Sequence, residues 1–112
     1  MDLRSRSEDN LQVVSVQNSR IDAAVAIEFK DAMRAATDGG QDTVVLDLSE
    51  VQFIDSSGLG AIVAAMKHMG KSRKLALAGL TPTVEKVFRL TRMDSVFSVF
   101  PTLDGALTDL KN

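Results

Sequence analysis

The sequence predicts an α/β fold in which an N-terminal hairpin leads into parallel strands, with about four helices. Two observations support this class. Short valine-rich runs alternate with longer segments whose apolar residues recur every three or four positions, and glycines or capping residues separate them. Strands that alternate with helices imply right-handed crossovers, and hence a mixed sheet of about four to five strands that is parallel after the first hairpin.

The first third of the chain predicts a hairpin and a helix. Residues 11–16 are typical of a strand, and residues 3–7 form a weaker strand that a polar turn joins to it. Asp22 is the expected N-cap of a helix in which Phe29 lies on the apolar face. The pair Gly39-Gly40 ends this helix, because glycine readily adopts the backbone conformation that follows a helical C-terminus.

The middle third predicts a buried strand, a polar junction and a second helix. Residues 43–48 are too short and too rich in valine for a helix, so we expect a central strand covered on both faces. The junction Asp-Ser-Ser-Gly-Leu-Gly at 55–60 follows, and an apolar helical run extends over residues 59–69. One side of this helix is expected to face the core, and another carries small residues that permit close approach. The core side comprises Leu59, Ile62, Val63, Met66 and Met69, and the small side comprises Gly60, Ala61, Ala64 and Ala65.

The last third predicts two further strands and two further helices. Residues 75–78 form a strand that ends at a glycine. Thr81-Pro82 marks the start of a helix, because a capping hydroxyl precedes proline at the first helical position. A short strand near residues 96–100 follows, and Thr102 is expected to cap the last helix.

Length and composition indicate a single domain over residues 1–112 that meets other proteins. The chain has 112 residues, of which 45% are hydrophobic, enough to bury one core. Its net charge of -2 argues against binding nucleic acid through the phosphates, which requires a surplus of Lys and Arg. The N-terminus lacks the apolar stretch of a signal peptide and no run is long enough to cross a membrane, so we expect a cytoplasmic protein without membrane insertion.

The residue types present give little support to enzymatic chemistry. A serine hydrolase needs a base beside its nucleophile, but the one histidine, His68, lies about three turns beyond Ser56 along the same predicted helix, roughly 15 Å or more away. The glycines match neither a phosphate-binding loop nor a dinucleotide fingerprint. With no Cys and a single His, no metal site is expected, and no cofactor is predicted.

The junction places two hydroxyls and a carboxylate where a helix begins. In largely parallel sheets, functional groups collect at the carboxyl ends of the strands. Asp22 and the junction both fall at such ends, so we expect Asp22, Asp55 and Ser56 to be neighbours although they are distant in sequence. Glycines at 58 and 60 let the backbone or a partner approach closely. The junction is therefore the predicted functional site.

The junction also resembles a known signature. Asp-Ser-Ser-Gly-Leu-Gly at 55–60, between a valine-rich strand and an alanine-rich helix, closely resembles that of bacterial anti-sigma-factor antagonists, the small single-domain members of the STAS family. The resemblance covers nearly the whole chain. Asp22 falls where that family has an acidic residue after its second strand, and residues 81–84 with Phe88 fall where it has a Pro-led helix. The chain departs from the family at Ser19-Arg20, where a glycine usually precedes a charged residue.

The resemblance implies a phosphorylation switch. In the family, the first serine after the aspartate, by position Ser56, is phosphorylated by a serine kinase that is itself the anti-sigma factor. The unmodified form binds that kinase and frees the sigma factor, and a PP2C-type serine phosphatase restores this form after phosphorylation. The residues expected to contact the partner are Asp22, Asp55, Ser57, Gly58, Leu59, Gly60, Ala61 and Ala64.

Structural interpretations of the same residues remain open at this point. Asp55, Ser56 and Ser57 are all of types that cap helices, and capping is compatible with phosphorylation because a phosphate there meets free backbone N–H groups. Asp22 is either a cap or part of the kinase interface. The small side of the helix either packs under a neighbouring helix or docks a partner. The alternative function is a constitutive STAS-like structural subunit, for example of a lipid-transport ATPase complex, in which Ser56 is never modified.

Overall fold

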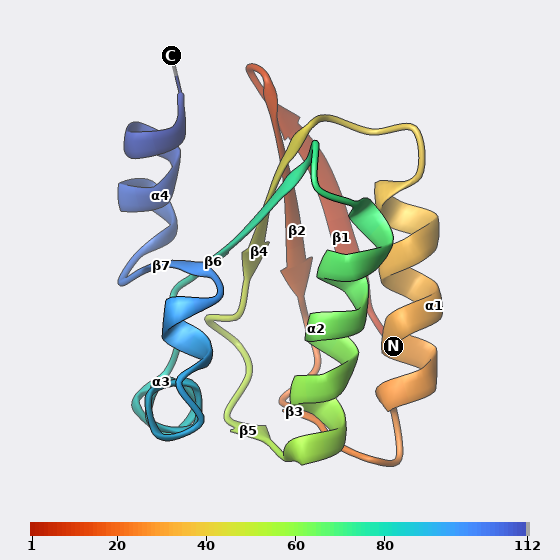
Figure 1. Ribbon diagram of the computed structural model, residues 1–112, viewed down its shortest axis with the longest axis vertical. Coiled ribbons are helices and arrows are strands. Elements are labelled where there is room, and N and C mark those ends of the chain that lie inside the picture. The colour runs from red at the N-terminus through yellow and green to blue at the C-terminus, as the bar shows by residue number, and fades with distance from the viewer. Residues whose placement is uncertain (112) are drawn as a thin grey trace.

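The computed structural model describes residues 1–111 and contains a five-stranded mixed sheet with helices on both faces (Figure 1). The strand order is β1-β2-β4-β6-β7. β1 pairs antiparallel with β2, and each later neighbour is parallel, which confirms the predicted hairpin and parallel crossovers. The strands of this sheet are β1 Leu3–Glu8, β2 Leu11–Val16, β4 Thr43–Asp47, β6 Lys74–Ala78 and β7 Ser98–Phe100.

Four α-helices and one short 3-10 helix complete the described part of the chain, together with a separate pair of two-residue strands. The helices are α1 Ala26–Thr37, α2 Ser56–Met69, α3 Pro82–Leu90, the 3-10 helix η1 Met93–Ser95, and α4 Leu103–Leu110. The additional strands are β3 Arg20–Ile21 and β5 Phe53–Ile54. No helix within residues 1–111 has the length and apolar character needed to span a membrane.

The alternation of side chains along the strands divides the core between the two faces of the sheet. Val14 of β2 and Leu46 of β4 are register partners on the face that packs with α1 and α2. Their neighbours Val13 and Val45, also register partners, face the other way, where Ala106 of α4 joins the cluster around Val45. β4 is therefore buried on both faces, as its valine-rich sequence predicts.

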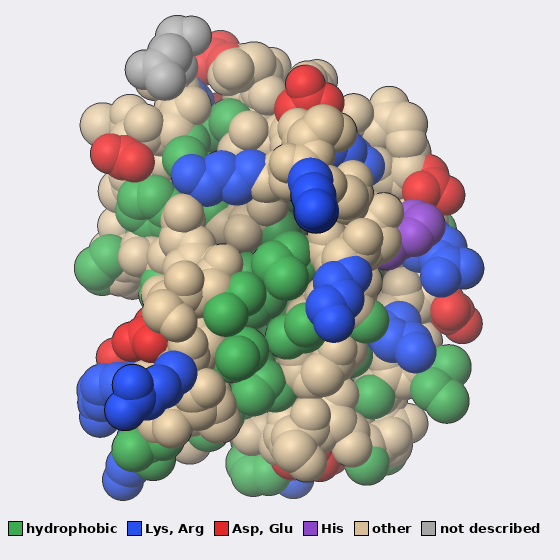
Figure 2. All heavy atoms as spheres, viewed as in Figure 1, with side chains coloured by type: hydrophobic (Ala, Val, Ile, Leu, Met, Phe, Trp, Pro, Cys, Tyr) green, Lys and Arg blue, Asp and Glu red, His purple; other side chains and the backbone are tan. Residues whose placement is uncertain are grey.

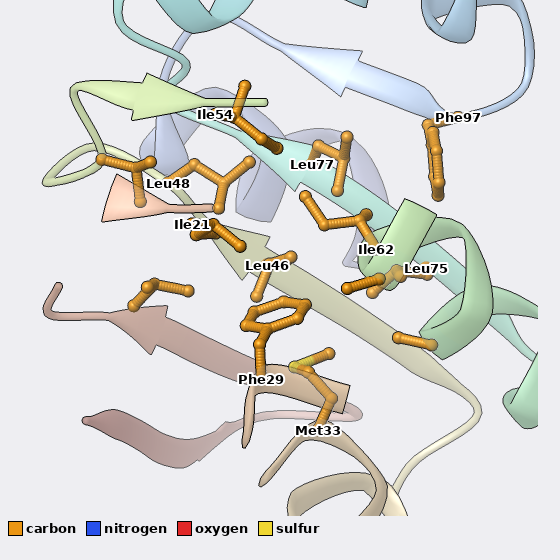
Figure 3. Packing of buried hydrophobic residues seen from close by; sticks show 14 of the residues in the cluster. Ile21, Phe29, Met33, Leu46, Leu48, Ile54, Ile62, Leu75, Leu77 and Phe97 are labelled. Atoms are coloured by element: carbon orange, nitrogen blue, oxygen red, sulfur yellow. The ribbon is translucent and has the colours of Figure 1, made fainter. Parts of the chain in front are cut away.

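The larger part of the core lies between the sheet and the helices α1 and α2. Figure 3 shows Phe29 and Met33 of α1 beside Leu46, and Ile62 of α2 near the strand β6. Phe29 and Ile62 are completely buried. Burying such side chains stabilises the fold by about 1.5–3 kcal/mol each relative to leaving them exposed. This packing holds α2, and hence the junction at its N-terminus, in a defined position.

Capping residues predict the starts of three helices, and the structure corrects two of these caps. Thr102 caps α4 as expected, since its hydroxyl oxygen accepts a hydrogen bond from the Gly105 N–H. Thr81 stands at the N-cap position of α3, but its hydroxyl donates to the carbonyl of Val51 at 2.8 Å instead. This bond ties the start of α3 to the loop that leads into β5.

The prediction that Asp22 caps the first helix is wrong, because α1 begins four residues later at Ala26. Asp22 Oδ1 accepts from the Ala24 N–H at 3.1 Å, and Oδ2 accepts from Arg20 Nε at the same distance. These contacts form a local turn, which competes with helical capping for the carboxylate. The last predicted strand is also shorter than expected, since β7 begins at Ser98.

Candidate functional site at the start of α2

The short parallel pair β3–β5 brings together the two segments that carry the predicted site. Ile21 lies opposite Ile54, and the Asp55 N–H donates to the Ile21 carbonyl at 3.4 Å. No periodic signal in the sequence marks these strands, because two residues are too few to show alternation. The pairing confirms that the Asp22 segment and the junction are neighbours.

Asp55 is the N-cap of α2 and also anchors the Asp22 segment. Its Oδ1 accepts from the Gly58 N–H at 2.9 Å, and its Oδ2 accepts from the Ala23 N–H at 3.0 Å. Backbone donors, first that of Gly58 and then those of Ala23 and Ser57, hold the pKa of Asp55 below its ordinary value, whereas desolvation opposes them. Asp55 therefore stays ionised at neutral pH and acts as a fixed part of the scaffold.

Ser56 and Ser57 are the first two residues of α2, and both are exposed. Within residues 1–111, neither hydroxyl has a hydrogen-bond partner, so capping is the role of Asp55 and not of the serines. The hydroxyls stand at the positive end of the helix dipole, where an attached phosphate is tolerated electrostatically. Their exposure leaves them free to be approached by an enzyme.

The two glycines of the junction have different surroundings. A Cβ on Gly58 would lie 1.9 Å from the carbonyl oxygen of Ile21, a distance at which atoms overlap. A Cβ on Gly60 would meet nothing within 4 Å. Of the two expected alternatives, close approach by the backbone applies to Gly58, which is buried because β3 packs against this turn, and Gly60 is the glycine that lies open to a partner.

The predicted sides of α2 also need correction. Ala61 and Ala65 of the small side are buried, which supports the packing alternative at these two positions. Val63 and Met66, expected in the core, are only half-buried. Small residues at positions 61 and 65 let α2 pack close to its neighbours, so the core side is displaced toward them. Leu59 is buried as expected.

Ala64 is half-buried, and it lies on the side of α2 that faces α1. It lines a hollow of about 260 Å³ between the two helices, together with Ile27 and His68. Ile27 is 71% exposed, which is unusual for a large apolar side chain and leaves hydrophobic surface available beside this hollow. His68 Nε2 lies 3.1 Å from Asp38 Oδ1. Its partner is therefore Asp38 and not Ser56, which lies at the opposite end of α2.

The polar groups of the site lie around the first turn of α2. No group of three or more His, Cys, Asp or Glu side chains among residues 1–111 is arranged to hold a metal ion. The arrangement consists of two exposed hydroxyls, a fixed carboxylate and an open glycine at the start of the helix. It can present a surface and accept a modification.

Comparison with known proteins identifies the family. The family model of the STAS domain matches residues 3–106. The chain belongs to the STAS domain family. Among relatives of this STAS domain, an anti-sigma-F factor antagonist, RsfB, of Mycobacterium tuberculosis is 27% identical over 92% of this chain and 84% of its own length. An anti-sigma-B factor antagonist of Listeria monocytogenes is 26% identical over 88% of this chain and 86% of its own.

Solved structures agree with this assignment. The crystal structure of an anti-sigma factor antagonist from Mycobacterium paratuberculosis is similar to this STAS domain with a TM-score of 0.88 and 31% identity. The match covers 99% of this chain and 94% of that one. The similarity therefore extends over the entire arrangement of sheet and helices that positions the junction.

Proposed function

We propose that this STAS domain is an anti-sigma-factor antagonist whose binding is switched by phosphorylation of Ser56. The observation that carries the proposal is the exposed Ser56 hydroxyl on a rigid first helical turn, in a chain whose relatives are named anti-sigma factor antagonists. The protein acts by binding and not as an enzyme. This role places it in the cytoplasm with an anti-sigma-factor serine kinase.

The proposed interface consists of the residues of the site that face outward. Ser56, Ser57 and Gly60 are exposed, and Ala64 continues the same side of α2. Gly60 lets the partner's surface approach the helix, because no side chain stands there. Asp22 borders this surface from the turn that Asp55 anchors. Gly58, Leu59 and Ala61 support the interface from beneath, since they are buried.

Phosphorylation transfers the γ-phosphoryl group of ATP to Ser56 Oγ, releases ADP, and passes the hydroxyl proton to a base of the kinase. The phosphate adds about -1.5 to -2 charges. The helix dipole favours an anion there by about 0.3–1 kcal/mol, and the carboxylates of Asp55 and Asp22 oppose it, so folding stability changes little. A PP2C-type phosphatase would hydrolyse the ester and restore the hydroxyl.

Binding responds much more strongly than folding. A charged phosphate buried against a surface shaped for a neutral hydroxyl lacks compensating donors, which costs several kcal/mol. A penalty of about 3 kcal/mol already weakens binding more than a hundredfold. The switch therefore acts at the interface, through charge and bulk.

The test compares phosphorylated and unmodified protein by backbone NMR, thermal melting and titration with the purified kinase. Shifts confined to the junction with a large loss of affinity support the mechanism. Widespread shifts, or a melting temperature changed by many degrees, would show that phosphorylation alters the fold. The alternative of a constitutive structural subunit requires that protein purified from its own cell carry no phosphate at Ser56 and that binding be indifferent to modification there.

A further inference from the structure

A second surface of the molecule is apolar and lies on the other flank of α2. Figure 2 shows hydrophobic side chains gathered between α2 and the segment formed by α3 and η1. α2 contributes Val63 and Met66, which are half-buried and pack against the large core cluster. From the other side, Val87 and Met93 pack against the same cluster, and Val96 is 47% exposed.

This surface is hollowed at the C-terminal end of α2. A depression of about 360 Å³ is lined by Met66, Gly70 and the stems of Lys67, Lys71 and Arg73. Gly70, which has a positive φ of 84°, ends the helix and leaves the depression open where a side chain would otherwise stand. It is separate from the hollow beside Ala64, which lies on the flank that faces α1.

Basic side chains border the apolar surface, although the chain as a whole is acidic. Figure 2 shows Lys and Arg side chains on both sides of the hydrophobic patch. Lys67 and Lys71 are exposed, and neither takes part in an ion pair within residues 1–111. Arg73, in contrast, is occupied, because it donates to the carbonyls of Thr37 and Gln41. The rim therefore offers lysine ammonium groups to an outside anion.

We propose that the surface between α2 and α3 binds an acidic amphipathic helix of a partner protein. Its apolar stripe would contact Val63 and Met66, and its carboxylates would meet Lys67 and Lys71. Residues spaced three and four apart on such a helix would lie along this apolar surface and reach the depression at the C-terminal end of α2. Val63 to Gly70 spans about 10 Å of helix axis, so about two to three turns of partner helix suffice. The proposal does not depend on the phosphorylation of Ser56.

The test is an NMR titration of the full chain with a synthetic 18-residue helical peptide that has leucines along one face and glutamates beside them. We expect shift changes at Val63, Met66 and Gly70. Lys67→Glu/Lys71→Glu should weaken binding about fivefold to thirtyfold, since we expect each of the two rim pairs to contribute about 0.5–1 kcal/mol, the upper part of the range for exposed ion pairs. The matched control Lys30→Glu/Arg34→Glu reverses two exposed cations beside the other hollow and should leave affinity within twofold.

Two further samples distinguish helix binding at this surface from attraction by net charge and from contact with a membrane. A peptide of the same composition with its leucines scattered should bind at least fivefold more weakly. Equal binding of the two peptides would contradict the proposal, because it would show that net charge alone causes the attraction. Vesicles of phosphatidylglycerol and phosphatidylcholine should not bind, and lysine-dependent vesicle binding without peptide binding would make the surface a membrane contact. Absence of any shift at about 1 mM of the first peptide would overturn the proposal.

Discussion

The two sides of the first turn of α2 differ in what holds them. The inner side is fixed, because Asp55 caps the helix and binds Ala23, and Gly58 packs against the Ile21 carbonyl. The outer side, with Ser56 and Gly60, contacts nothing comparable and is exposed. A single hexapeptide thus both fixes the start of the helix and presents an exposed surface. Its two glycines differ accordingly, since Gly58 is enclosed and Gly60 is open.

The largest expected effect follows from substituting the two glycines. Gly58→Ala should lower the free energy of unfolding by about 2–4 kcal/mol, because the added Cβ cannot fit beside the Ile21 carbonyl without moving the backbone. Gly60→Ala should keep or raise stability by up to about 1 kcal/mol, since alanine favours a helix. Urea denaturation measures both. Equal losses would remove the distinction between the two sides.

Exchanging the serines sharpens the same comparison on the outer side. Ser56→Ala should abolish phosphorylation and keep the protein bound to its kinase in the presence of ATP. Under the same conditions wild type becomes phosphorylated, and its affinity for the kinase should fall more than a hundredfold. Ser57→Ala is the matched control and should still be phosphorylated. Mass spectrometry and pull-down provide the readouts, and phosphate found at Ser57 in the Ser56→Ala protein would refute the assignment.

Adding bulk at the open glycine should affect binding without affecting folding. Gly60→Val places a branched side chain where the partner is proposed to approach, so kinase affinity should fall about tenfold while stability changes by less than about 0.5 kcal/mol. Calorimetric titration and thermal melting separate the two quantities. A lower melting temperature with normal affinity of the folded fraction would mean that Gly60 serves packing.

The cap on the inner side should make stability depend on pH. Because the folded state lowers the pKa of Asp55, its carboxylate stabilises the fold above the pKa that it has in the unfolded chain, and the contribution is lost as the pH falls through the folded value. Asp55→Asn keeps an acceptor for Gly58 but places an amide against Ala23. Wild type should be the more stable at pH 7, and the difference should shrink below about pH 4. A difference independent of pH would exclude the charge as its cause.

Asp22→Ala should have the smallest effect. Loss of the bonds to Ala24 and Arg20 costs about 0.5–1.5 kcal/mol of stability, and recognition by the kinase should weaken severalfold if the turn borders the interface. Phosphorylation kinetics measured on the folded variant test this. Wild-type kinetics would leave Asp22 with a purely structural role.

Local sequence determined most of the secondary structure. The strands β2, β4 and β6 and the helices α2 to α4 appear where periodicity and capping residues predict them, because these signals depend on neighbouring residues alone. Periodicity also locates α1, although this helix begins four residues after its predicted cap. Asp55 is recognisable as a candidate cap for the same reason. The proximity of Asp22 to the junction could also be predicted, because both follow strands and the carboxyl ends of parallel strands lie at the same edge of a sheet.

The exposure of each residue in the site was decided by tertiary structure. The pairing of β3 with β5 joins segments about thirty residues apart and places the Ile21 carbonyl against Gly58, so the enclosure of this glycine depends on tertiary structure. Likewise, Ala61 and Ala65 are buried and Met66 is partly exposed because of how closely α2 packs with its neighbours. Sequence periodicity identifies an apolar side of a helix, but only the packed neighbours determine where that side ends.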